Sequence, residues 1–301
     1  MSVFSVNGKT YTVTENVSLM RFLRDELRLT SVKDGCSEGA CGTCTVIIDG
    51  KAVKACVQKI SNLDGKSVIT AEGLSEREKQ VYSHAFSEAG AVQCGFCIPG
   101  MVMCAKALID KNPSPSPEDV KYAIRNNLCR CTGYKKIEEA ILLAAEIIRE
   151  NREITNPVST GLLGESMSRV DASAKALGEA KYADDFYMDG MVYGSALRSE
   201  YPRAEILSID KSEAESMDGV LCVMTAEDIP GTQKVGHLKR DWDVIVPVGK
   251  TTHYLGDAVA LVAAETPEIL EKAKKAIKVE YNPLDGVFSP AEAMKDGAPL
   301  V

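Results

Sequence analysis

The sequence of 301 residues has no long uninterrupted hydrophobic run and no excess of basic residues. About 20 consecutive apolar residues are needed to span a bilayer as a helix, so we expect no membrane-spanning segment. The formal net charge is −8, from 35 Lys and Arg against 43 Asp and Glu. This acidic balance argues against binding nucleic acid through its phosphates.

The amino-terminal stretch MSVFSVNGKT lacks the basic segment and apolar run of a secretory signal. Together with ten cysteines, this predicts a reducing, cytoplasmic location. Histidine is scarce, with three in the chain, and His237 and His253 lie apart in the sequence. We expect these two to be structural or exposed rather than metal ligands.

Eight of the ten cysteines form two groups of four, and these are the most informative feature of the chain. The first group reads C-x4-C-x2-C-x11-C and the second reads C-x2-C-x31-C-x-C. Their members are Cys36, Cys41, Cys44 and Cys56, and Cys94, Cys97, Cys129 and Cys131. The first spacing is that of plant-type [2Fe–2S] ligation. The pattern predicts two iron–sulfur clusters and an electron-transfer role, because the cluster supplies the redox chemistry.

The loop CSEGACGTC suits such a cluster because it is rich in glycine. An oxidised [2Fe–2S] cluster with four thiolates carries a net charge of about −2 and needs hydrogen-bond donors near its sulfurs. Gly35, Gly39 and Gly42 allow the backbone to wrap tightly and to aim N–H groups at the cluster.

Zinc is the main alternative for these cysteines. Structural zinc sites use paired C-x2-4-C knuckles, which the first group fits poorly, whereas the second group alone leaves zinc open. A disulfide framework is disfavoured, since a chain of this length can build a core without one. The remaining cysteines, Cys104 and Cys222, lie in the apolar stretches MVMCAKALI and GVLCVMT, and we expect both to be small buried core residues.

Residues 1–75 have the pattern of a small β-rich domain. Asn7-Gly8 and Gly50 each separate two strand-like segments and predict hairpins. Ser18 can cap a short helix in LMRFLRDEL. Cys56 falls in the second arm of the Gly50 hairpin, so we expect this ligand on a strand.

Residues 76–151 change to helical periodicity. Ser75 and Glu78 form a capping box, and Ser116-Pro117-Glu118-Asp119 is a second helix start. Ile137, Ile141, Ala144 and Ile148 mark one face of a last helix. We expect four helices, with Cys94 and Cys97 before the second and Cys129 and Cys131 before the fourth.

The rest of the chain divides into a linker and a third domain. Residues 152–168 are rich in proline, glycine and serine, as linkers are. Residues 169–301 mix strand-like segments with one helix, PEILEKAKKA, which predicts an α+β domain.

The chain resembles the molybdenum hydroxylases, the xanthine oxidase and aldehyde oxidoreductase family. The matching strings are GCSEGACGTCTV, QCGFCIPGMVM and NLCRCTGY, followed by RVDASAKALGEAKYADDF and HYLGDAVALVAAET. The resemblance implies an α+β chain with a β-grasp [2Fe–2S] ferredoxin domain, a four-helix [2Fe–2S] domain and an α/β hammerhead domain. One departure is Pro202-Arg203-Ala204, where the family often has histidine at the middle position.

The resemblance also implies cofactors and roles. The cluster of Cys94, Cys97, Cys129 and Cys131 would lie next to a molybdopterin, for which the cytosine dinucleotide form is one option. Gln93 and Cys131 would contact that cofactor. The other cluster would pass electrons to an acceptor, which could be a flavin subunit, a ferredoxin or a flavodoxin. The complete enzyme would be a homodimer.

No FAD domain separates the helical domain from the hammerhead, an arrangement similar to flavin-free aldehyde oxidoreductases and selenium-dependent xanthine dehydrogenases. In the family, the molybdopterin-binding domains and the catalytic glutamate follow the hammerhead. The sequence stops at Val301, so we assign no catalytic residue. We expect the electron-transfer portion of an oxidoreductase acting on an aldehyde or a purine. The alternative is a separate iron–sulfur subunit that docks on a catalytic chain.

Overall fold

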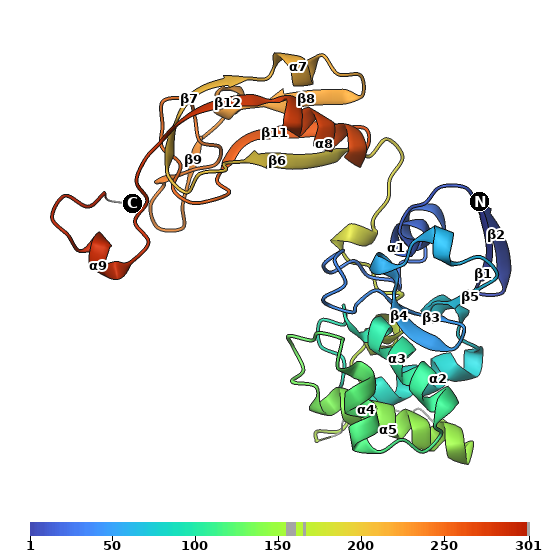
Figure 1. The fold of residues 1–301 in the computed structure, drawn as a ribbon. Coiled ribbons are helices and arrows are strands. Elements are labelled where there is room, and N and C mark those ends of the chain that lie inside the picture. Colours follow the sequence, from blue (N-terminus) through green and yellow to red (C-terminus); the bar gives the residue numbers. More distant parts are fainter. Residues whose placement is uncertain (155–160, 165–166, 300–301) are drawn as a thin grey trace. The chain divides into compact units, whose positions relative to one another are not determined.

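The computed structural model describes residues 1–154, 161–164 and 167–299 of an α+β protein (Figure 1). Its contacts divide the chain into two compact units, Met1–Phe186 and Tyr187–Val301. Part of the predicted linker at 152–168, namely 155–160 and 165–166, lies outside the described residues, as do 300 and 301.

The first unit begins with a five-stranded sheet in the order β2-β1-β5-β3-β4. β1 and β5 run parallel, while the other neighbours are antiparallel. The strands are β1 (Ser2–Val6), β2 (Lys9–Val13), β3 (Thr45–Ile48), β4 (Lys51–Lys54) and β5 (Ser67–Ile69). The short helix α1 (Leu19–Arg21) continues as a π-helical turn, Phe22–Glu26, and buries Leu19, Phe22 and Leu23 in the core with Phe4.

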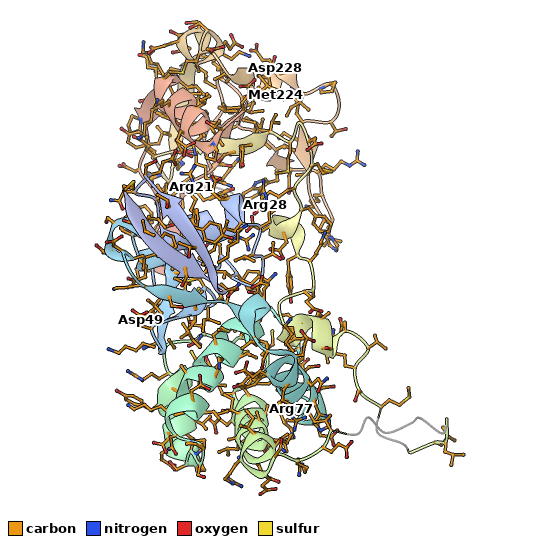
Figure 2. All side chains as sticks on the ribbon, turned by 90° about the vertical axis from the view of Figure 1, so that its right-hand side faces the viewer. Arg21, Arg28, Asp49, Arg77, Met224 and Asp228 are labelled. Carbon is orange, nitrogen blue, oxygen red and sulfur yellow. The ribbon has the colours of Figure 1, made fainter. Side chains whose placement is uncertain are left out.

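Local signals in the sequence account for the turns of this sheet. Asn7 and Gly8 both have positive φ, 49° and 81°, as a type I′ hairpin requires. Asp49 and Gly50 do the same between β3 and β4. The side chain of Asp49 (Figure 2) also accepts a hydrogen bond from the Ser67 N–H at 2.9 Å, which ties this turn to β5. Ser18 caps α1 as predicted.

The position of Cys56 differs from the prediction. The residue lies in a 3₁₀ turn, Ala55–Val57, that follows β4, and not on the strand. The Ala55 N–H donates to the Cys44 carbonyl oxygen at 3.1 Å, and the chain then turns with a Gln58 N–H bond to Ala55. The turn brings the Cys56 thiol close to the Cys44 thiol. If the strand had continued, Cys56 would lie beyond Cys44.

Four helices follow the sheet and share one hydrophobic core (Figure 1). They are α2 (Glu76–Glu88), α3 (Ile98–Lys111), α4 (Pro117–Ile124) and α5 (Lys135–Glu150). The predicted caps at Ser75 and Ser116 both form. Cys104 is buried in this core, as predicted. Arg77, on the first turn of α2 (Figure 2), donates to the Arg152 carbonyl oxygen beyond the end of α5.

The sheet and the helices meet at the loop that carries the first cysteines. α3 packs against β3. Gly42, with φ of +73°, passes so near the α4–α5 connection that an added Cβ would lie 2.4 Å from the Asn126 carbonyl oxygen. On the other side, a Cβ on Gly100 of α3 would lie 2.8 Å from the Gly42 oxygen. The loop is therefore held between two elements with room only for glycine.

Residues 172–186 also belong to the first unit, although the sequence pattern assigned them to the third domain. The short helix α6 (Ala172–Ala176) buries Ala172, Ala176 and Leu177 in the same core as α2 and α3. Burial of these small apolar side chains explains why the contacts divide the chain after Phe186 and not near residue 169.

The second unit combines small sheets with one amphipathic helix. Its three-stranded sheet has the order β6-β11-β8, and β12 pairs with β7. The longer elements are β6 (Tyr193–Arg198), β7 (Ala204–Asp210), β8 (Val220–Met224), β11 (Ala258–Ala264), α8 (Pro267–Ala276) and β12 (Lys278–Pro283). The shorter ones are α7 (Ser212–Glu215), the paired strands β9 (Lys234–Val235) and β10 (Trp242–Asp243), and α9 (Pro290–Ala293). α8 is the helix that the sequence pattern predicted, and it buries Leu270 and Ala273 against this sheet.

Cys222 is exposed, so its predicted burial is wrong. It lies on β8, at the edge of the three-stranded sheet. The buried side chain of this strand is that of the next residue, Val223. His237 and His253 are exposed, as expected. Within the described ranges, the helices are too short or too polar to cross a lipid bilayer.

A pair of glycine substitutions tests the close packing of the first cysteine loop. Gly42 and Gly65 have nearly the same φ, 73° and 71°, so alanine costs about 1–2 kcal/mol at either. A Cβ on Gly65 meets nothing within 4 Å, whereas the Gly42 clash adds about 1–3 kcal/mol. We expect Gly42→Ala to destabilise the first unit more than Gly65→Ala, measured by hydrogen exchange of the α3 and β3 amides. Equal losses would contradict the packing.

Candidate metal centres

The thiols of the first cysteine group converge from two segments. Cys36, Cys41 and Cys44 lie on the loop that leads into β3, and Cys56 lies in the 3₁₀ turn after β4. The side chains of Cys36 and Cys41 interact with each other, as do those of Cys44 and Cys56, and Cys41 also interacts electrostatically with Cys44. The structure thus brings all four predicted ligands together.

Backbone donors surround this group as the glycine-rich loop predicted. The N–H groups of Cys41, Glu38 and Ala40 point at the Cys36 sulfur and lower the pKa of that thiol to about 7. The N–H of Cys41 lies 3.4 Å from it. Burial instead raises the pKa of Cys44 to about 12. The loop itself is held by Lys54, whose Nζ donates to the Gly39 carbonyl oxygen at 2.6 Å.

The second group converges from the two loops that precede α3 and α5. Cys97 is the N-cap residue of α3, and Cys129 and Cys131 lie shortly before α5. Here the interacting thiol pairs are Cys97 with Cys129 and Cys94 with Cys131. Electrostatic coupling of Cys94 with Cys97 and of Cys129 with Cys131 joins the two pairs into one set.

The surroundings of the second group are uneven. Burial raises the pKa of Cys97 above its ordinary value. Burial acts in the same direction on Cys129, but hydrogen bonds from the Thr132 hydroxyl and backbone outweigh it and leave the pKa of Cys129 lowered. The Cys129 sulfur and Thr132 Oγ1 lie 3.0 Å apart. Cys94 and Cys131 are exposed, and so is the neighbouring Gln93.

The two sets fit iron–sulfur clusters better than zinc ions. All ten cysteines carry free thiols, so none of the eight is used in a disulfide. A structural zinc ion needs all four ligands around one centre. Each set consists of two thiol pairs, which suits two irons because each iron of a [2Fe–2S] cluster takes two thiolates.

The two cysteine loops are joined directly by hydrogen bonds. The Leu128 N–H donates to the Cys41 carbonyl oxygen at 2.8 Å. Beside it, the buried Asn127 side chain donates to the Gly42 carbonyl oxygen, also at 2.8 Å. Tyr134 then donates from its hydroxyl to the Asn127 carbonyl oxygen and accepts from the Cys129 N–H, at 3.2 and 2.9 Å.

Asn127 and Tyr134 were not identified as site residues from the sequence. Both stand in the string NLCRCTGY, which was singled out for its cysteines. A polar side chain directly beside a ligand loop was the available signal. That Asn127 reaches residue 42, and not a nearby backbone group, follows from packing between distant segments.

Three family models match the chain in the expected order. They are the 2Fe-2S iron-sulfur cluster binding domain over residues 5–81, the [2Fe-2S] binding domain over 70–142, and the aldehyde oxidase and xanthine dehydrogenase a/b hammerhead domain over 177–285.

Individual relatives agree with these models. The chain is 35% identical to the aldehyde oxidoreductase of Megalodesulfovibrio gigas over 98% of its own length and 35% of the relative. It is 50% identical to the nicotinate dehydrogenase small FeS subunit of Eubacterium barkeri over 47% of this chain and 92% of that subunit.

The solved structure of the Desulfovibrio gigas aldehyde oxidoreductase superimposes with a TM-score of 0.90 at 34% identity, covering 98% of this chain and 35% of that one. The chain therefore spans about a third of the length of the aldehyde oxidoreductases that it matches. With its two converging sets of four thiols in matched iron–sulfur domains and a hammerhead domain after them, the chain belongs to the xanthine oxidase and aldehyde oxidoreductase family of molybdenum hydroxylases.

Proposed function

We propose that this chain is the electron-transfer part of a molybdenum hydroxylase and that it holds two [2Fe–2S] clusters. The observation that carries the proposal is the convergence of eight thiols into two separate sets, each made of two interacting pairs. When bound, each cluster supplies transfer of one electron at a time.

The proposed ligands of the first cluster are Cys36 and Cys41 for one iron and Cys44 and Cys56 for the other. For the second cluster, the same pairing assigns Cys97 with Cys129 and Cys94 with Cys131. Backbone N–H groups donate to the Cys36 sulfur, and Thr132 donates to the Cys129 sulfur. Both sets of hydrogen bonds favour the thiolate, which is the form that binds metal.

The second group is proposed as the one nearer to molybdopterin, which is the cofactor of the family. Gln93 and Cys131 are exposed and available to a group outside the first unit. The Gln93 amide offers both a donor and an acceptor, which suits the edge of a pterin ring. We propose that these two residues contact the pterin, with the cytosine dinucleotide form as one option.

The hydrogen-bonded contact between the cysteine loops supports transfer from one group to the other. From the Cys41 carbonyl oxygen, the route crosses a 2.8 Å hydrogen bond to Leu128 and reaches Cys129 through one peptide unit. The Asn127 side chain adds a second hydrogen bond between the two loops, to the Gly42 carbonyl oxygen at 2.8 Å. The first group is accordingly proposed as the exit toward the acceptor, which could be a flavin subunit, a ferredoxin or a flavodoxin.

The complete enzyme is proposed to pair this chain with molybdopterin-binding domains, either in the same polypeptide or on another subunit. The match to aldehyde oxidoreductases runs through both the cluster domains and the hammerhead domain. It favours a fused, flavin-free arrangement and an aldehyde, rather than a purine, as the substrate class. The small FeS subunits among the relatives correspond to the first 150 residues or so, and they represent the alternative arrangement.

Single cysteine substitutions test the ligand assignment. In anaerobically purified chain, Cys41→Ser should remove one of two reduced-cluster signals in electron paramagnetic resonance, and Cys129→Ser should remove the other. Each variant should keep about half of the wild-type iron. Cys222→Ser is the matched control, since Cys222 is exposed in the second unit, and it should leave both signals unchanged. Loss of both signals in each ligand variant would show that the sets are not independent sites.

A kinetic comparison tests the direction of transfer. Because the first group is proposed as the exit, Cys41→Ser in the complete enzyme should slow reoxidation by the acceptor at least tenfold while substrate still reduces the second cluster. Stopped-flow absorbance after mixing the enzyme with substrate follows both steps. Reoxidation at the wild-type rate would contradict the assignment of the first group as the exit.

A further inference from the structure

Residues 172–186, here called the strap, contact the loop of the second cysteine group and the residues just before the first group. Its first part lies against the second group's loop: a Cβ added to Gly95 would meet Lys175 side-chain carbons at 2.7 Å. Farther along, Gly178, with φ of +78°, passes between Ser31 and Pro99 at the start of α3. Because side chains would not fit at these crossings, the strap follows one defined path.

Tyr182 is the residue through which the strap reaches the second group. Its hydroxyl donates to the carbonyl oxygen of Cys94, a proposed ligand, at 2.7 Å. Its ring meets that of Phe96 edge to face, with centroids 5.2 Å apart. The Tyr182 side chain therefore holds both the backbone and a side chain of the Cys94–Cys97 loop.

The buried ion pair of Lys33 and Asp185 holds Tyr182 in position. Lys33 Nζ lies 2.5 Å from Asp185 Oδ2 and 4.7 Å from the centroid of the Tyr182 ring, and both ionic side chains are almost fully buried. The same carboxylate oxygen accepts the Tyr182 N–H at 3.0 Å, and its other oxygen accepts from Arg24 at 3.1 Å. Separating a buried ion pair is strongly destabilising because it leaves an uncompensated charge in the protein interior. The pair therefore holds residues 182–185 in one position.

The strap reaches the first group through Lys33. The Lys33 carbonyl oxygen accepts from the Thr43 hydroxyl at 3.0 Å, and that hydroxyl oxygen lies 3.3 Å from the Cys41 sulfur. The contact to the first group thus passes through two residues, whereas Tyr182 contacts the second group's loop directly.

We propose that Tyr182 is a positioning residue for the second cluster, with the Lys33–Asp185 pair holding Tyr182 in place. This inference deepens the proposed function and rests on it. The hydroxyl hydrogen carries partial positive charge and bonds the backbone of a ligand residue at 2.7 Å, so we expect it to favour the more negative, reduced state of the cluster. Segments after the four-helix domain therefore take part in setting the second cluster's potential, which the cysteine motifs alone do not reveal.

Tyr182→Phe tests the proposal in the full chain, because it removes the hydroxyl and keeps the ring on Phe96 and Lys33. We expect the midpoint potential of the second cluster to fall and its paramagnetic resonance g-values to change, while those of the first cluster stay the same. Tyr182→Leu, which also removes the ring, should produce a larger shift. The two signals are distinguished by their loss in Cys129→Ser and Cys41→Ser.

Tyr122→Phe is the control, since Tyr122 is an exposed tyrosine on α4. It should leave both clusters unchanged. If the wild-type chain shows two cluster signals and Tyr182→Phe moves neither, or moves both equally, the role of Tyr182 is wrong and the proposed function stands. If the wild-type chain holds no [2Fe–2S] cluster, the proposed function fails, and the inference fails with it.

Discussion

The hydrogen bond from the Leu128 N–H to the Cys41 carbonyl oxygen is the contact on which the arrangement of the two cysteine groups depends. It joins a loop of the sheet domain to a loop of the helical domain at 2.8 Å, and Asn127 reinforces it with a second bond to Gly42. Such a close approach of two backbones is tolerated because residue 42 has no side chain. Two sites that are far apart in the sequence are thereby made neighbours.

Electrostatics explains why each loop is built as it is. Four thiolates in one place repel one another, and the apolar core next to Cys44 and Cys97 raises the pKa of both thiols. Donors at Cys36 and Cys129 act in the opposite direction. Metal binding requires deprotonated thiols, so the donors around Cys36 and Cys129 offset part of the cost of burial. A bound cluster would add four metal–sulfur bonds and so stabilise both loops.

The sequence predicts those features that depend on local chemistry. The Asn7-Gly8 turn, the caps at Ser75 and Ser116, and the loops carrying Cys94, Cys97, Cys129 and Cys131 all form as expected, because each depends on residues close in the chain. The features that differ depend on distant partners. Cys56 turns away from its strand to meet Cys44, and Cys222 is exposed because β8 lies at a sheet edge. The Lys33–Asp185 pair joins residues 152 positions apart, which no local pattern indicates.

The measurement that tests the account most directly is the metal and sulfide content of the anaerobically purified chain, made with an adequate supply of iron. We predict about four irons and four acid-labile sulfides per chain, with a visible absorption that bleaches on reduction. About two zinc ions per chain, with no labile sulfide and no visible absorption, would contradict it and leave two structural zinc sites in place of an electron-transfer path.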